Sequence, residues 1–155
     1  MSLRSRLIRM LSLGGYVAFN MPRTVTAAGV ALLLGCVATH IYAVLSQPDR
    51  PAFFLVYVAA AVTGCGLIAV LLCLTRSPVA MQLSWVLGSA ASVVIAGIVA
   101  GTRIVRLSAL PAITGRWDVA AATLTLAFAG AFVALHATVL LGINVAYPRR
   151  QHWMD

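Results

Sequence analysis

The feature that most limits the fold of this chain is a set of four long apolar segments, each free of Asp, Glu, Lys and Arg. They cover residues 25–45, 52–74, 79–102 and 119–145. A helix needs about 20 apolar residues to cross a bilayer, so every segment is long enough. Backbone groups inside a bilayer must be hydrogen-bonded within the protein, which favours helices. The sequence therefore predicts an all-α polytopic membrane protein with four transmembrane helices.

The connections between these segments are short. Residues 46–51 join the first pair and 75–78 join the second and third, whereas 103–118 form one longer loop. Short connections force consecutive helices to lie side by side in opposite directions. We therefore expect an antiparallel four-helix bundle that occupies residues 24–147 and leaves no room for a second, aqueous domain.

The composition agrees with this class and explains the charge. Of all residues, 62% are hydrophobic and 9% are charged, whereas a soluble domain has roughly 25% charged residues. The net charge of +8 is the difference between eleven basic residues, all of them Arg, and three Asp residues. Because they lie at or near the ends of apolar segments, they indicate membrane topology and contacts with anionic lipids rather than nucleic-acid binding.

Two terminal segments flank the bundle. In residues 1–23, apolar and Arg side chains alternate at helical spacing, which predicts an amphipathic arm on the membrane surface instead of a cleaved signal peptide. Residues 148–155 form a short tail. The side that holds both termini is richer in Arg, which predicts cytoplasmic termini in a bacterial plasma membrane. The Arg residues on this side are Arg4, Arg6, Arg9, Arg23, Arg76, Arg149 and Arg150.

Small residues recur every four positions in the third and fourth segments, where they allow helices to approach closely. Such stripes predict protein packing, either within this bundle or against another subunit. In the third segment the residues are Ser84, Gly88, Ser92, Ala96 and Ala100, with Gly97 and Gly101 beside them. In the fourth segment they are Gly130, Ala134, Thr138 and Gly142.

His40 and His136 are the two conventional ionisable residues well inside the segments, which makes them candidates for contact with a ligand or partner. Helical rise places them about 9 Å apart in depth, which disfavours joint ligation of one haem. We expect each imidazole to hydrogen-bond a neighbouring helix or a backbone carbonyl. We predict no cofactor and no metal site. Because no nucleophile has a His-plus-acid partner, we also predict that the chain is not an enzyme.

The loop 103–118 is the longest exposed connection and is basic. Arg103, Arg106 and Arg116 are candidates for contact with an acidic partner, a lipid headgroup or an anionic ligand. Asp118 precedes the fourth segment, where an acid stabilises a helix N-terminus. It could also pair with one of the three Arg residues.

Several short motifs add a resemblance. His40 lies in the last part of the first segment, Asp49-Arg50-Pro51-Ala52-Phe53-Phe54 leads into the second, and Thr102-Arg103 closes the third. Leu110-Pro111 and Trp117 precede the fourth. The pattern resembles small four-helix membrane proteins of actinobacteria, which are similar in size and type to accessory subunits of respiratory cytochrome bcc–aa3 supercomplexes.

Three functions are compatible with the sequence. The small-residue stripes and the lack of buried charge favour a non-catalytic accessory or assembly subunit that binds other integral membrane subunits. The two intramembrane His residues fit a small transporter or a ligand-binding membrane protein. A haem- or quinone-linked redox protein is the third alternative.

Overall fold

The fold comes from a computed structural model, which describes residues 22–141, 143, 144 and 146. This part of the chain is helical, with α2 (Pro22–Ser46), α3 (Ala52–Leu74), α4 (Pro78–Ile104) and α5 (Ala120–Leu140). Each helix is long and apolar enough to cross a membrane. The predicted all-α class and its four candidate transmembrane helices are therefore confirmed, and the chain is a multi-pass membrane protein.

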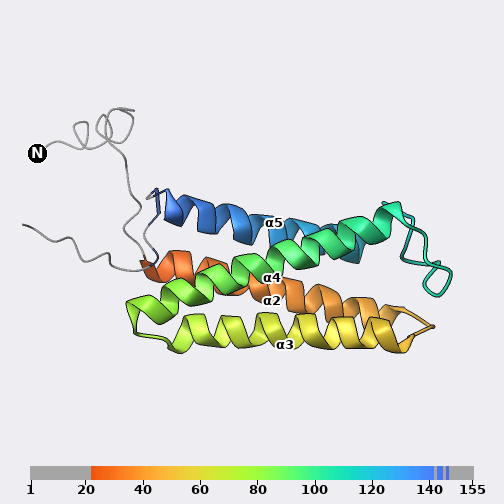
Figure 1. The fold of residues 1–155 in the computed structure, drawn as a ribbon, viewed down its shortest axis with the longest axis horizontal. Coiled ribbons are helices and arrows are strands. Elements are labelled where there is room, and N and C mark those ends of the chain that lie inside the picture. The colour runs from red at the N-terminus through yellow and green to blue at the C-terminus, as the bar shows by residue number, and fades with distance from the viewer. Residues whose placement is uncertain (1–21, 142, 145, 147–155) are drawn as a thin grey trace, which may run out of the picture.

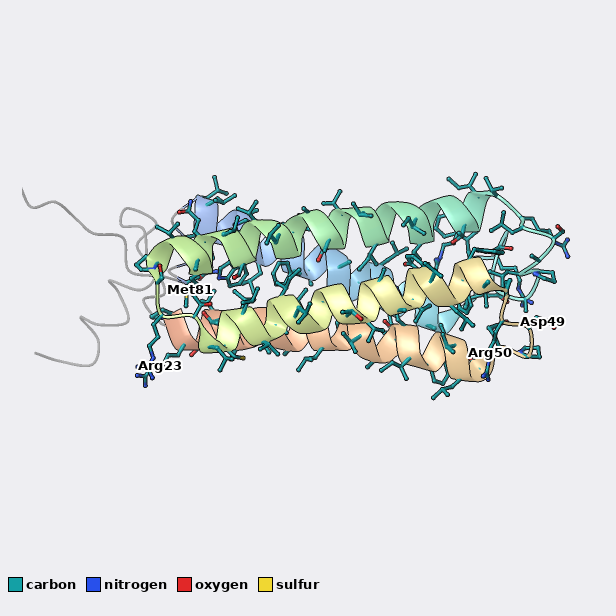
Figure 2. All side chains as sticks on the ribbon, turned by 60° about the horizontal axis from the view of Figure 1, so that its bottom comes forward. Arg23, Asp49, Arg50 and Met81 are labelled. Atoms are coloured by element: carbon teal, nitrogen blue, oxygen red, sulfur yellow. The ribbon has the colours of Figure 1, made fainter. Side chains whose placement is uncertain are left out.

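The four helices lie side by side in a closed ring. α2 packs against α3 and α5, and α4 packs against α5 and, less closely, α3. The connections 47–51 and 105–119 lie at one end of the bundle, which we call the loop end (Figure 1). Figure 2 shows Asp49 and Arg50 at this end and Arg23 and Met81 at the opposite end. Charged side chains thus flank the apolar length of the bundle.

Helix boundaries follow local chemistry. α2 and α4 begin at Pro22 and Pro78, where the fixed proline φ suits a helix start. α5 ends at Leu140, before the predicted end at residue 145. Beyond it, the amide nitrogens of Ile143 and Asn144 both donate to the Thr138 carbonyl, at 2.9 and 3.1 Å. The chain therefore turns back and satisfies a carbonyl that the helix leaves free.

The core explains the small-residue stripe of α4. Trp85 and Phe132 are fully buried, and their rings stack with centroids 5.2 Å apart. A Cβ atom on Gly88 would lie 2.7 Å from Phe132 Cζ, and one on Gly29 would lie 2.7 Å from Trp85 Cη2. The glycines therefore make room for aromatic rings inside this bundle. Ser84 and Ser92 are also buried within it.

The other predicted packing residues lie differently. Ala96, Ala100 and Thr138 are half-buried, whereas Gly97, Gly101, Gly130 and Ala134 are exposed on the outside of the bundle. A Cβ atom on Gly97, Gly101 or Gly130 would meet nothing within 4 Å. The stripes thus have an inner part, used by this bundle, and an outer part that faces the surroundings. Gly142, the predicted amphipathic arm up to residue 21 and the tail 148–155 lie outside the described residues.

Candidate functional site

A cavity of about 510 Å³ lies among the helices at the loop end. This volume falls within the roughly 300–1,000 Å³ typical of small-molecule sites. Its walls are mainly aliphatic and aromatic, and they include no Asp, Glu, Lys or Arg. All four helices and the 105–119 loop contribute, among others Thr39, His40, Ala43, Phe54, Tyr57, Val58, Ile98, Val99, Thr102, Leu110, Ile113, Ala121 and Thr125.

His40 and Tyr57 form a hydrogen-bonded pair in the wall of the cavity. His40 Nδ1 lies 2.7 Å from the Cys36 carbonyl oxygen, and Nε2 lies 2.9 Å from the Tyr57 hydroxyl. A carbonyl can only accept, so Nδ1 donates, and Nε2 of the neutral ring accepts the Tyr57 proton. The pair joins α2 to α3. It provides the neighbouring-helix and carbonyl bonds expected for His40, and it occupies both ring nitrogens.

Two threonines extend this network to α5. Thr39 Oγ1 donates to the Cys36 carbonyl at 2.9 Å, and Thr125 Oγ1 lies 2.8 Å from Thr39 Oγ1. Because the Thr39 proton is committed, the contact across α2 and α5 uses the Thr125 proton, which also lies within reach of the Ala121 carbonyl at 2.9 Å. Both threonines are buried. A continuous chain of hydrogen bonds therefore ties three helices together at the cavity.

The same proton assignments define what the cavity offers a ligand. Tyr57 donates to His40, Thr102 donates to the Val99 carbonyl at 2.9 Å, and Ser46 donates to the Ala43 carbonyl at 3.2 Å. Each hydroxyl oxygen keeps an acceptor position. These oxygens can accept a hydrogen bond from a ligand, whereas the side chains of Tyr42 and Gln47, which also line the wall, can donate one. The polar groups of the wall are uncharged, and they suit a hydroxyl, which both donates and accepts.

The 105–119 loop forms part of the cavity wall as a folded unit. Thr114 is 1% exposed; its hydroxyl lies 2.7 Å from the Leu110 carbonyl and accepts the Leu107 amide at 2.9 Å. Gly115 has a φ of 66°, which glycine adopts without strain, and its amide donates to the Thr102 carbonyl at 2.9 Å. Leu110 packs with Phe54 and Val58 of α3. Internal hydrogen bonds and one apolar anchor therefore hold the loop over the helices.

Arg103 lies in the last turn of α4 rather than in the loop, and it is buried. Its Nη2 donates to Thr123 Oγ1 at 2.7 Å and to the Val119 carbonyl at 3.3 Å. The guanidinium lies 5.1 Å from the centroid of the Trp117 ring, a cation–π distance. Its place at a helix C-terminus is also electrostatically favourable. Arg103 therefore fastens the start of α5 to the end of α4.

The remaining charged loop residues face outward. Arg116 and Asp118 form a two-pronged ion pair, with Arg116 Nε 3.0 Å from Asp118 Oδ1 and Nη2 2.5 Å from Oδ2. The hydrogen bond from Arg116 holds the pKa of the Asp118 carboxyl below its usual value. Asp118 thus pairs with Arg116 among the predicted partners, and Val119, not Asp118, is the N-cap of α5. Arg106 is exposed.

His136 belongs to a separate cluster. Its Nδ1 lies 2.6 Å from Ser89 Oγ of α4, and its ring stacks on Trp85 with centroids 5.7 Å apart. His40 and His136 therefore have different hydrogen-bond partners and different neighbours. In the described part of the chain, no group of three or more His, Cys, Asp or Glu residues could hold a metal ion.

Sequence reasoning missed Tyr57, Thr39 and Thr125, and for Tyr57 a signal exists. His40 and Tyr57 lie at similar distances from the 47–51 turn, on opposite sides of it. In a helical hairpin such residues reach the same depth, so the turn position is the signal that identifies the pair.

The chain matches no protein-family model, no curated protein and no solved structure.

Proposed function

We propose that this protein binds a small neutral amphiphile that carries a hydroxyl head, in the cavity at the loop end. The observation that carries the proposal is an apolar cavity of about 510 Å³ with uncharged hydrogen-bonding groups in its wall. A charged ligand would lose its hydration there without an opposite charge to replace it. An alcohol loses little, because the wall oxygens accept its proton. The protein is then a ligand-binding membrane protein without catalytic chemistry.

The test uses the full chain in lipid nanodiscs and three probes of equal chain length: 1-dodecanol, dodecanoate and dodecane. Native mass spectrometry counts bound probe, and thermal unfolding measures stabilisation. We expect dodecanol to bind and to raise Tm more than the anion or the alkane. Equal effects of the three probes would show that the cavity does not recognise a hydroxyl head.

A matched pair of variants tests the location. Ala43 lines the cavity and Ala38 lies on the exposed side of the same helix. Ala43→Phe fills part of the cavity and should abolish dodecanol binding, whereas Ala38→Phe should leave it unchanged. Retained binding in Ala43→Phe would contradict the proposal.

The topology that accompanies this proposal is an antiparallel bundle in a bacterial plasma membrane, with both termini in the cytoplasm. The loop end then faces the outside, and the cavity lies in the outer leaflet. Two observations support this topology. Successive connections lie at alternating ends of the bundle (Figure 1), and the side that holds the termini is richer in Arg. Cysteine labelling from the outside should modify Ser108→Cys in the exposed loop and not Ser77→Cys at the other end.

The outer faces of the helices support a second function. In this function the protein is an accessory subunit of a larger membrane complex, such as a respiratory one. Gly97, Gly101 and Gly130 have open space at their Cβ positions, so a helix of another integral subunit can approach their backbones. Mild detergent extraction should then recover a stable partner, and Gly97→Leu should release it. Recovery of the chain without partners would contradict this function.

A further inference from the structure

A second hollow lies beside the cavity, in the seam between α3 and α4. Its volume is about 220 Å³, and it is lined mostly by small and aliphatic residues. Ala60, Gly64 and Ala91 leave this space, because none of them has a side chain long enough to reach the facing helix. The seam is also where neighbouring helices pack least closely. The hollow thus lies along the contact between α3 and α4, which is the least closely packed contact of the ring.

The seam adjoins the cavity. Tyr57 of α3 and Ile98 of α4 line both spaces. From Tyr57 the seam extends to Gly64, seven residues further along α3, which corresponds to about 10 Å at about 1.5 Å per residue. Its other wall runs from Ile98 back to Ala91, near the middle of α4. The hollow therefore extends from beside the cavity toward the middle of the membrane.

The seam also opens sideways. Ala60, Val94 and Ile98 are exposed along its edges, and a Cβ atom on Gly64 would meet nothing within 4 Å. In a membrane these surfaces face lipid tails. At the loop end, residues of the folded 105–119 loop, including its anchor Leu110, form part of the cavity wall.

We propose that the ligand is a neutral amphiphile with a single hydrocarbon chain, whose chain lies in the α3–α4 seam, and that it enters sideways from the bilayer. This inference rests on the proposed function, because it assigns the head to the cavity. The Tyr57 hydroxyl stands where head and chain meet. The seam holds no charged side chain and no wide chamber, so it suits one extended chain.

The probe is dodecan-1-ol with a photoactivatable diazirine near the end of its chain. Peptide mapping after irradiation in nanodiscs should place the label on α3 near Gly64 and on α4 near Ala91 and Val94. Binding of unmodified dodecanol, read by native mass spectrometry, is measured in parallel so that seam and cavity are tested separately.

Gly64 and Gly66 provide a matched pair. Both lie in α3 with no atom within 4 Å of a built Cβ, but only Gly64 lines the seam. Gly64→Trp fills the seam and should weaken dodecanol binding about tenfold, the loss expected when roughly two methylene groups lose their apolar contacts. The seam label should disappear with it. Gly66→Trp should leave both readings unchanged.

Three other outcomes overturn the inference. If dodecanol binding is abolished by Ala43→Phe but unchanged by Gly64→Trp, the cavity holds the ligand and the seam does not. If binding is insensitive to Ala43→Phe as well, the proposed function itself is wrong. If Gly64→Trp dissociates an oligomer seen by mass photometry, the seam holds a helix of a second copy.

Discussion

The contrast between Gly88 and Gly97 of α4 gives a sharp test of the packing. A Cβ on Gly88 would lie 2.7 and 2.8 Å from Phe132 Cζ and Cε1, and 3.4 Å from Ile68 Cγ2. Phe132 is fully buried and stacked on Trp85, so its ring cannot swing aside. Overpacking a core lowers the free energy of unfolding by about 1–3 kcal/mol. Replacing a helical glycine by alanine raises it by up to about 1 kcal/mol. We expect Gly88→Ala to destabilise by about 1–2 kcal/mol.

Gly97 is the control, because it lies in the same helix and has open space at its Cβ position. Gly97→Ala should be neutral or stabilise by up to about 1 kcal/mol. Unfolding free energies by steric trapping in bicelles measure both variants. Phe132→Leu should partly rescue Gly88→Ala, because a smaller side chain leaves room for the new methyl group. Equal stabilities of the two alanine variants would refute the packing argument.

Three further predictions concern the loop end. Thr125→Val removes the hydrogen bond to α2 and should cost about 0.6 kcal/mol, the average for such bonds in membranes, in the same unfolding assay. Arg103→Met releases Val119 and Thr123, so trypsin should cleave the 105–119 loop faster; an unchanged rate would show that Arg103 does not fasten it. In an NMR titration, Asp118 should stay ionised at pH values below the usual carboxyl pKa of about 3.9, because Arg116 lowers its pKa. Arg116→Gln should therefore raise the pKa of Asp118.

The sequence predicted the number, type and approximate ends of the helices, because hydropathy and segment length decide them. It could not decide whether the small-residue stripes face inward. Ser84, Gly88 and Ser92 point to the core while Gly97 and Gly101 face outward, and only the rotation of α4 against its neighbours separates them. The four-residue spacing is shared by both faces.

The candidate site was predictable only in part. His40 stood out as an intramembrane imidazole, but its role depends on Tyr57 and on Thr39 and Thr125, which are unremarkable residues in the sequence. The cavity also needs the loop to return over the helices, which depends on the hydrogen bonds of Thr114 and on the positive φ of Gly115. These tertiary contacts leave no periodic signal.

The folded loop over the cavity has a consequence for measuring affinity. If the bundle is closed at the loop end and admits ligand only through the α3–α4 seam, the protein samples the ligand dissolved in the lipid. Occupancy then follows the mole fraction of ligand in the bilayer. A Kd expressed as total concentration will rise in proportion to added lipid, whereas a Kd expressed as mole fraction will stay constant.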